Sequence, residues 1–242
     1  MNNLIYNDQL PQYMVGLTRL KQSTNQQFSW LQTHGCKAHR HRYNTHFSCF
    51  LKEYGIEEKI GYIDTEFYVG RNRWGRLAGD WGFILCYVLG DGKGNYASDC
   101  IKPDEIFTTQ DKRIVESCIT EIKKYDRLIH HFGDGCDIPL LRTRALIHGL
   151  DFPGHGEIYS TDLYKIAKNK LTLSSNSQRV ISKVFTGKTE KTEVEGELWL
   201  AASRGDKEAL DKILLHCQAD VRDLERNARK LLPFIALTKR SI

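Results

Sequence analysis

The segment that most limits how this chain can fold is IGYIDTEFYV, residues 60–69. Apolar, β-branched and aromatic side chains lead up to Asp64 and Glu66, which predicts a buried strand carrying two acids. Residues two apart in a strand project from the same face, so the two carboxylates point to one place. Carboxylates that close repel each other unless a cation lies between them, and oxygen ligands suit Mg²⁺ or Mn²⁺. The alternative is an exposed strand end with two solvated acids.

Composition sets broad limits on the kind of protein. The chain has 242 residues, of which 40% are hydrophobic and 27% charged, values typical of a globular protein of one large domain or a domain with an appendage. It has no apolar run as long as a membrane span, and its polar start is unlike a secretory signal. Seven scattered cysteines indicate a reducing compartment with free thiols or metal ligands. We therefore expect a cytoplasmic protein with no membrane partner.

A Cys/His-rich segment, residues 34–49, precedes the acidic strand. Cys36-x2-His39 and His46-x2-Cys49 have the paired spacing that lets two short turns hold one zinc ion, with His41 as a further candidate. The other interpretation is a solvated basic loop in which the histidines are incidental. The two interpretations are compatible, because a metal-pinned basic loop can also contact nucleic acid.

Two basic segments flank the acidic strand in the sequence. The first contains Lys37, Arg40 and Arg42, and the second contains Arg71, Arg73, Trp74 and Arg76. Arginine contacts phosphate and a tryptophan face can stack on a base, so both segments are candidate nucleic-acid contacts. The second could instead be a hairpin turn whose tryptophan packs on the core. The net charge of +5 is compatible with a polyanionic partner.

The rest of the chain alternates predicted strands and helices. We expect strands at 60–69, 83–90, 96–101 and 127–132, and helices at 110–124, 140–149, 171–185, 197–206 and 206–232. Asp137 lies at a strand-to-helix junction, where it could also be a helix N-cap. His216 and Asp220 are four residues apart and share one face of the last helix, where they could be a plain surface pair.

Taken in this order, the acids resemble the motifs of the DEDD (DnaQ-like) 3′–5′ exonucleases. Asp64 and Glu66 match the first motif, and Asp137 matches the second, with Cys136 in the place of its aromatic residue. Asp220 matches the third, and His216 stands at the spacing where a tyrosine is usual, which is similar to the predicted-exonuclease branch of the superfamily. The resemblance covers roughly residues 58–232.

The resemblance implies an α/β, ribonuclease-H-like fold with a mixed five-stranded sheet flanked by helices. The exonuclease domain would occupy residues 58–242, after a Cys/His-rich N-terminal extension at 1–57. The implied activity is metal-dependent phosphodiester hydrolysis from a single-stranded 3′ end of DNA or RNA. Two Mg²⁺ or Mn²⁺ ions would be held by the four acids, and His216 would act as base or orient the attacking water.

Two other functions are compatible with the same residues. A non-catalytic nucleic-acid-binding module would use the Cys/His segment and the basic loops, although the presence of all four acids argues against it. A structure-selective endonuclease would use the same fold on internal bonds. Asp162, a further acid in an apolar stretch, is expected to support the structure or a metal ligand.

Overall fold

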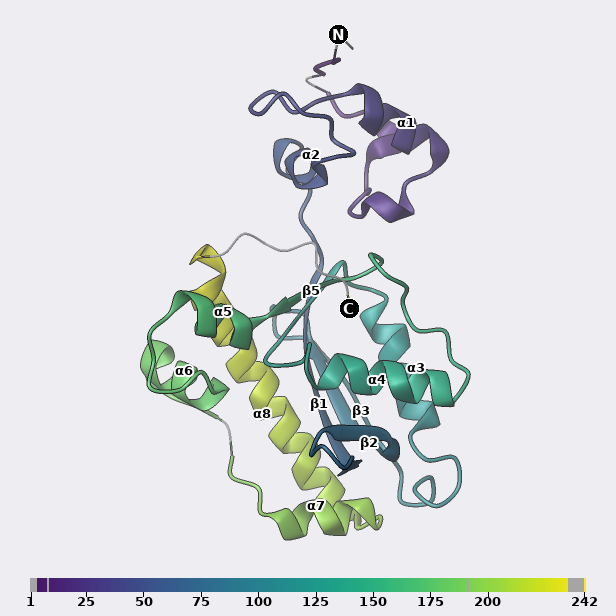
Figure 1. Cartoon of the computed structure of the whole chain (residues 1–242), viewed down its shortest axis with the longest axis vertical. Helices are drawn as coiled ribbons and strands as arrows, with labels where there is room; N and C mark the ends of the chain where they lie inside the picture. Colours follow the sequence, from purple (N-terminus) through teal and green to yellow (C-terminus); the bar gives the residue numbers. More distant parts are fainter. Residues whose placement is uncertain (1–3, 8, 191, 235–241) are drawn as a thin grey trace. The chain divides into compact units, whose positions relative to one another are not determined.

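The computed structural model describes residues 4–7, 9–190, 192–234 and 242. The chain divides into two compact units, Met1–Lys59 and Ile60–Ile242. Figure 1 traces both units. Among the described residues, no helix combines the length and the apolarity that a membrane span requires.

The first unit is a small helical module with its own core. It contains 3₁₀ helices η1 (Gln12–Met14) and η2 (Leu20–Gln22) and helices α1 (Asn25–Thr33) and α2 (Phe47–Glu53). Its buried side chains are Met14, Leu17, Trp30, Leu31, Cys36, Tyr43, Phe47, Cys49, Phe50 and Leu51. The Trp30 ring stacks on that of His34, with centroids 4.0 Å apart, and Met14 and Leu17 join Trp30 in this core.

The second unit is built on a mixed sheet with the strand order β3-β2-β1-β4-β5. The strands are β1 (Ile60–Arg71), β2 (Leu77–Gly90), β3 (Tyr96–Cys100), β4 (Arg127–His130) and β5 (Tyr159–Asp162). β1 to β3 form an antiparallel meander, while β4 pairs parallel with both β1 and β5. The predicted α/β fold with a mixed five-stranded sheet is therefore confirmed.

Helices cover both faces of this sheet. They are α3 (Lys112–Ile122), α4 (Asp137–Ile147), α5 (Leu163–Lys170), α6 (Gln178–Thr186), α7 (Gly196–Ser203) and α8 (Lys207–Leu231), followed by the 3₁₀ helix η3 (Leu232–Phe234). Figure 1 shows α8 on one side of the strands and α3 and α4 on the other. Every residue of β2 from Phe83 to Leu89 is buried. This agrees with helices on both faces of the sheet, because a strand covered on both faces carries apolar residues on both.

The β1–β2 pairing contains two irregularities that shape the region after the acids. The register shifts between Glu66 and Phe67 and again between Val69 and Gly70. Gly82 lies opposite Val69 with φ 150°, and a Cβ there would lie 2.1 Å from the Tyr68 carbonyl oxygen. Bulges of this kind increase the twist and re-aim side chains.

Two predicted boundaries differ from the structure by six or seven residues. β2 begins at Leu77, six residues before the predicted start at residue 83, because its first part completes a hairpin with the end of β1. The helix predicted at 171–185 begins only at Gln178, where the Ser177 hydroxyl accepts a hydrogen bond from the Val180 amide and caps it. The polar run before Ser177 therefore leads into the helix and is not part of it.

Candidate active site

The acids of β1 face helix α8. Asp64 and Glu66 share one face of the strand, while Thr65 points to the opposite face. The Cys217 thiol of α8 lies 3.4 Å from both the carbonyl oxygen and Oδ2 of Asp64, which shows that this face of β1 meets α8 directly. The side-chain donor atoms of Asp64, Glu66 and Cys217 all lie within 4.8 Å of one another.

Helix α8 adds a histidine and a further acid to the same place. His216 Nε2 lies 3.7 Å from Glu66 Oε1 and 3.8 Å from Asp220 Oδ2. Because His216 and Asp220 are one helical turn apart, α8 presents both to the strand without any special backbone geometry. The structure thus brings together the predicted residues of the first and third motifs.

The His216 ring is held on its other side by the loop before α7. His216 Nδ1 lies 2.6 Å from the Thr192 hydroxyl, and the Trp199 ring meets the imidazole edge to face at a centroid distance of 6.3 Å. A histidine whose Nδ1–H is donated to an oxygen keeps a lone pair on Nε2. This arrangement can therefore present Nε2 to the space beside Glu66 and Asp220.

Asp137 approaches from the opposite side of the strand. It is the first residue of α4, and its Oδ1 accepts hydrogen bonds from the Thr65 hydroxyl at 2.5 Å and the Thr65 amide at 3.2 Å. Burial raises the pKa of the Asp137 carboxyl, and the bonds from Thr65 partly offset this rise. Asp137 is thus tied to the strand residue that lies between Asp64 and Glu66.

Cys136 precedes Asp137 in the chain. Burial raises the pKa of its thiol to about 12, and the negative charges of Asp137, Asp64 and Glu66 add to the rise in that order. Around β1 and α8, the donor atoms of the described residues form two tight groups: Asp64 and Glu66 with Cys217, and Glu66 with His216 and Asp220. Asp137 belongs to neither group.

The donor set fits a hard divalent cation. Asp64, Glu66 and Asp220 offer carboxylate oxygens from a strand and a helix that pack together, and oxygen ligands are those that Mg²⁺ and Mn²⁺ prefer. Carboxylates gathered at this spacing repel one another, and a bound cation would remove the repulsion.

Comparison of the chain with models of known protein families identifies its superfamily. The model of the RNase H superfamily matches residues 80–231, more than half of the 242-residue chain. The chain belongs to the RNase H superfamily. The match starts within β2, so β1 and its two acids lie before it.

A solved structure supports the same fold for this RNase H superfamily protein. The family B DNA polymerase from the hyperthermophilic archaeon Pyrobaculum calidifontis is similar to it, with a TM-score of 0.59 and 17% sequence identity. The similarity covers 74% of this chain but only 25% of the polymerase. A search of curated proteins gives no match. The family match and the solved structure thus agree on the fold of the chain.

The basic segment after β1 forms the tip of the β1–β2 hairpin in this RNase H superfamily protein. Its turn is closed from within, because Arg71 Nη1 donates to the Gly75 carbonyl at 2.6 Å. The Arg73 guanidinium carbon lies 4.6 Å from the centre of the Trp74 ring. Arg76 is exposed, like the other two arginines. The predicted contact residues thus share one exposed turn, with Arg71 partly occupied in holding it.

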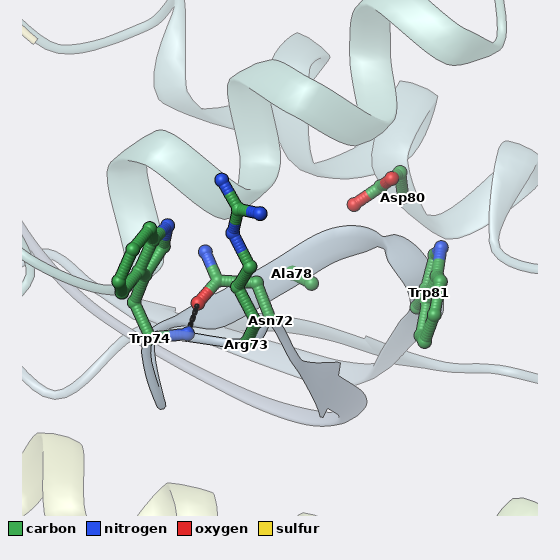
Figure 2. Close-up of a pocket in the computed structure, with 6 residues that line it drawn as sticks. All are labelled: Asn72, Arg73, Trp74, Ala78, Asp80 and Trp81. Atoms are coloured by element: carbon green, nitrogen blue, oxygen red, sulfur yellow. Dashed lines mark hydrogen bonds between the residues drawn. The ribbon is translucent and has the colours of Figure 1, made fainter.

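Two tryptophans line a hollow of about 350 Å³ on this hairpin. Figure 2 shows Trp74 and Trp81 on opposite sides of the hollow, with Arg73 beside Trp74. Both tryptophans are 70% exposed, so Trp74 does not pack on the core as the alternative interpretation required. Trp81 was not singled out from the sequence, although it shares the hairpin with Trp74.

A second group of acids, Asp134 and Asp162, lies with His130 where β4 and β5 end. Asp162 ends β5 and caps α5, accepting hydrogen bonds from the Tyr164 and Phe132 amides. Beside it, burial would raise the pKa of Asp134, but hydrogen bonds with His130, Lys165 and Ser160 outweigh burial and hold that pKa well below its usual range. These hydrogen bonds join the end of β4 to the end of β5 and the start of α5.

Sequence reasoning missed three residues of the site. Cys217 has the spacing of the core face of α8 and is buried there, but its thiol also touches Asp64. Thr65 separates the two acids in the sequence, and its hydroxyl donates a hydrogen bond to Asp137. Thr192 lies in a polar loop with no recognisable pattern, so only the structure brings it to His216.

Proposed function

We propose that this protein is a metal-dependent 3′–5′ exonuclease that removes nucleotides from single-stranded ends. The observation that carries the proposal is the meeting of Glu66 on β1 with His216 and Asp220 on α8, at 3.7 and 3.8 Å. Membership of the RNase H superfamily supplies the wider context of nucleic-acid cleavage. The order of the acids along the chain, with Asp137 between the two motifs, supports the exonuclease assignment within it.

Each residue of the cluster has a defined part in this proposal. Asp64, Glu66 and Asp220 would hold the divalent ions, and Asp137 would be the fourth acid, fixed in place by Thr65. Bound Mg²⁺ or Mn²⁺ ions would activate the attacking water and stabilise charge on the leaving oxygen.

His216 would accept the proton of the attacking water at Nε2. Its Nδ1–H would be donated to the Thr192 hydroxyl, 2.6 Å away, which fixes the ring and its tautomer. The acids beside Nε2 would stabilise the imidazolium that forms. The burial of His216, only 7% exposed, limits the orientations that the ring can adopt.

The hairpin tip would contact the substrate strand. Arg73 and Arg76 would neutralise phosphates, and the exposed face of Trp74 would stack on a base. The basic segment of the first unit, with Lys37 and Arg40 exposed, would add phosphate contacts of its own.

The test is a cleavage time course on single-stranded DNA and RNA oligonucleotides labelled at the 3′ or the 5′ end, with Mg²⁺, Mn²⁺ or EDTA. A 3′–5′ exonuclease releases the 3′ label at once as a mononucleotide and shortens the 5′-labelled strand step by step. Cleavage of a covalently closed circle would instead establish the endonuclease, and binding without cleavage would establish the non-catalytic module.

The matched variants are Asp64→Asn and Asp151→Asn. Asp64→Asn removes a charge from the cluster and should abolish turnover while strand binding persists. Asp151 is an exposed acid whose Oδ2 lies 3.2 Å from Lys123 Nζ, so its variant should cleave normally. Normal turnover by Asp64→Asn would refute the site assignment.

A further inference from the structure

The small first unit gathers cysteine and histidine side chains that have no part in the proposed nuclease site. The Cys49 thiol is the meeting point: its Sγ lies 3.0 Å from His46 Nδ1 and 3.3 Å from His39 Nδ1. His39 Nδ1 in turn lies 3.6 Å from Cys36 Sγ. Both cysteines are buried and free of disulfides. Sulfur and imidazole nitrogen at these separations form a different donor set from the carboxylates of the second unit.

The backbone explains why these side chains meet. Cys36 and His39 lie in a tight turn in which the Arg40 amide donates to the Cys36 carbonyl and the Cys36 amide donates to the His41 carbonyl. Arg40 has φ 54°, a left-handed conformation that reverses the chain between the ligands. His46 is the N-cap residue of α2, and the Cys49 amide donates to its carbonyl, so this pair is fixed within one helical turn.

We propose that Cys36, His39, His46 and Cys49 hold one structural zinc ion in the first unit, outside the nuclease site. Zinc binds thiolate at about 2.3 Å and imidazole at about 2.0–2.1 Å with tetrahedral angles, which places sulfur and nitrogen ligands about 3.5 Å apart. The sulfur–nitrogen distances of 3.6, 3.3 and 3.0 Å bracket this value. Two thiolates with two imidazoles are the set that selects zinc over the hard cations.

His41 is the competing fourth ligand, and two observations argue against it. Its Nε2 lies 4.0 Å from Cys49 Sγ, farther than the nitrogens of His39 and His46. Its other ring nitrogen, Nδ1, is buried and has no hydrogen-bond partner among the described residues. Histidines that bind metals almost always donate the second ring N–H to an acceptor, which His41 cannot do here. The His41 ring instead flanks His46, with centroids 4.5 Å apart.

A zinc ion would explain how so small a unit keeps a defined fold. Its two helices have nine and seven residues, and its core is a single small cluster. Modules of this size commonly depend on disulfides or a metal. Cys36 and Cys49 belong to that core, so the ion would tie the turn at residues 36–39 to the start of α2 from within.

Metal analysis of the full chain, purified without added metal, tests the proposal directly. We expect about one zinc per chain. Replacement by Co²⁺ should give the absorption bands of a tetrahedral site with thiolate charge transfer. Cys49→Ser should lose the ion, and His46→Ala should lose it or bind it at least tenfold more weakly. His41→Ala, the matched control, should retain one zinc per chain.

Hydrogen exchange keeps the test independent of folding failure and of nuclease activity. Chelation of the zinc should speed amide exchange across residues 30–53 and leave β1 to β5 unchanged. A chain that neither contains zinc nor binds added Zn²⁺ or Co²⁺, while its first unit is protected from exchange, overturns the proposal. Loss of zinc in His41→Ala with retention in His46→Ala overturns the ligand assignment. Neither result depends on whether the second unit cleaves nucleic acid.

Discussion

Replacement of His216 by alanine is the most informative perturbation of the proposed nuclease. His216 Nε2 lies between Glu66 Oε1 at 3.7 Å and Asp220 Oδ2 at 3.8 Å, so the variant removes the proton acceptor but none of the carboxylates. A positioned acid–base group contributes roughly 10²–10⁴ in rate. At about 1.36 kcal/mol for each factor of ten, the activation barrier should rise by about 2.7–5.4 kcal/mol.

Thr192→Val provides the matched comparison. It removes the hydrogen bond to His216 Nδ1 but leaves the imidazole, and one such bond is worth about 0.5–1.5 kcal/mol, or a rate change of roughly two- to tenfold. The loss in His216→Ala should therefore exceed the loss in Thr192→Val by at least about tenfold, given the range for acid–base groups.

The assay is single-turnover cleavage of a 5′-labelled single strand at saturating Mg²⁺ or Mn²⁺, with metal affinity measured separately by calorimetry. His216→Ala should bind metal as the native protein does, and its melting temperature shows whether the buried site has kept its fold. Full activity in His216→Ala would refute a catalytic role. Partial activity in His216→Tyr would favour orientation of the water over proton abstraction.

The other predictions concern substrate binding and stability. Trp74→Ala should weaken binding of single strands by about 1–3 kcal/mol in a titration, and Trp81→Ala by a similar amount if its ring also stacks; unchanged affinities would exclude the hollow as a contact. Asp111→Ala should lower the free energy of unfolding by about 3–5 kcal/mol in denaturant, because it leaves the buried Arg144 guanidinium, now 2.7 Å from Asp111 Oδ1, without its partner; a loss below 1 kcal/mol would contradict this. The lowered pKa of Asp134 means that the unfolded chain binds its proton first as pH falls below about 3.9, so stability should fall with pH there, and Asp134→Asn should flatten that slope.

Strand β1 and its two acids could be predicted from the sequence, because charged residues are unusual inside an apolar segment. Asp64 and Glu66 interrupt an apolar run, and an interruption that burial penalises needs a chemical reason. Helical spacing alone predicted that His216 and Asp220 share one face of the last helix. Their meeting with Glu66 depended on the packing of α8 against β1, which residue spacing does not encode and which only the family resemblance suggested.

Three other features of the structure leave no recognisable local pattern in the sequence. The core of the first unit uses Met14 from a 3₁₀ helix, Leu17 from the loop after it and Trp30 from a short helix, and these apolar residues show no sustained period. The late start of α6 depended on which of several serines caps the helix, and a run of cap-forming residues does not distinguish them. Thr65 could be read as a partner of Asp137 only once α4 was placed on the other face of the sheet.

The length of the β1–β2 hairpin would set the shortest strand that the proposed enzyme can hold at both the site and the hairpin tip. β1 continues from Glu66 to Arg71, a span of about 17 Å at roughly 3.4 Å per residue. A strand stacked as in duplex DNA advances about 3.4 Å per nucleotide, so about five nucleotides would lie between the terminal phosphodiester and the hairpin tip. Once digestion leaves fewer than that, the remaining fragment would lose its contact with the hairpin. Degradation by such an enzyme would slow or stop at short oligonucleotides, while longer strands stay bound from one cut to the next.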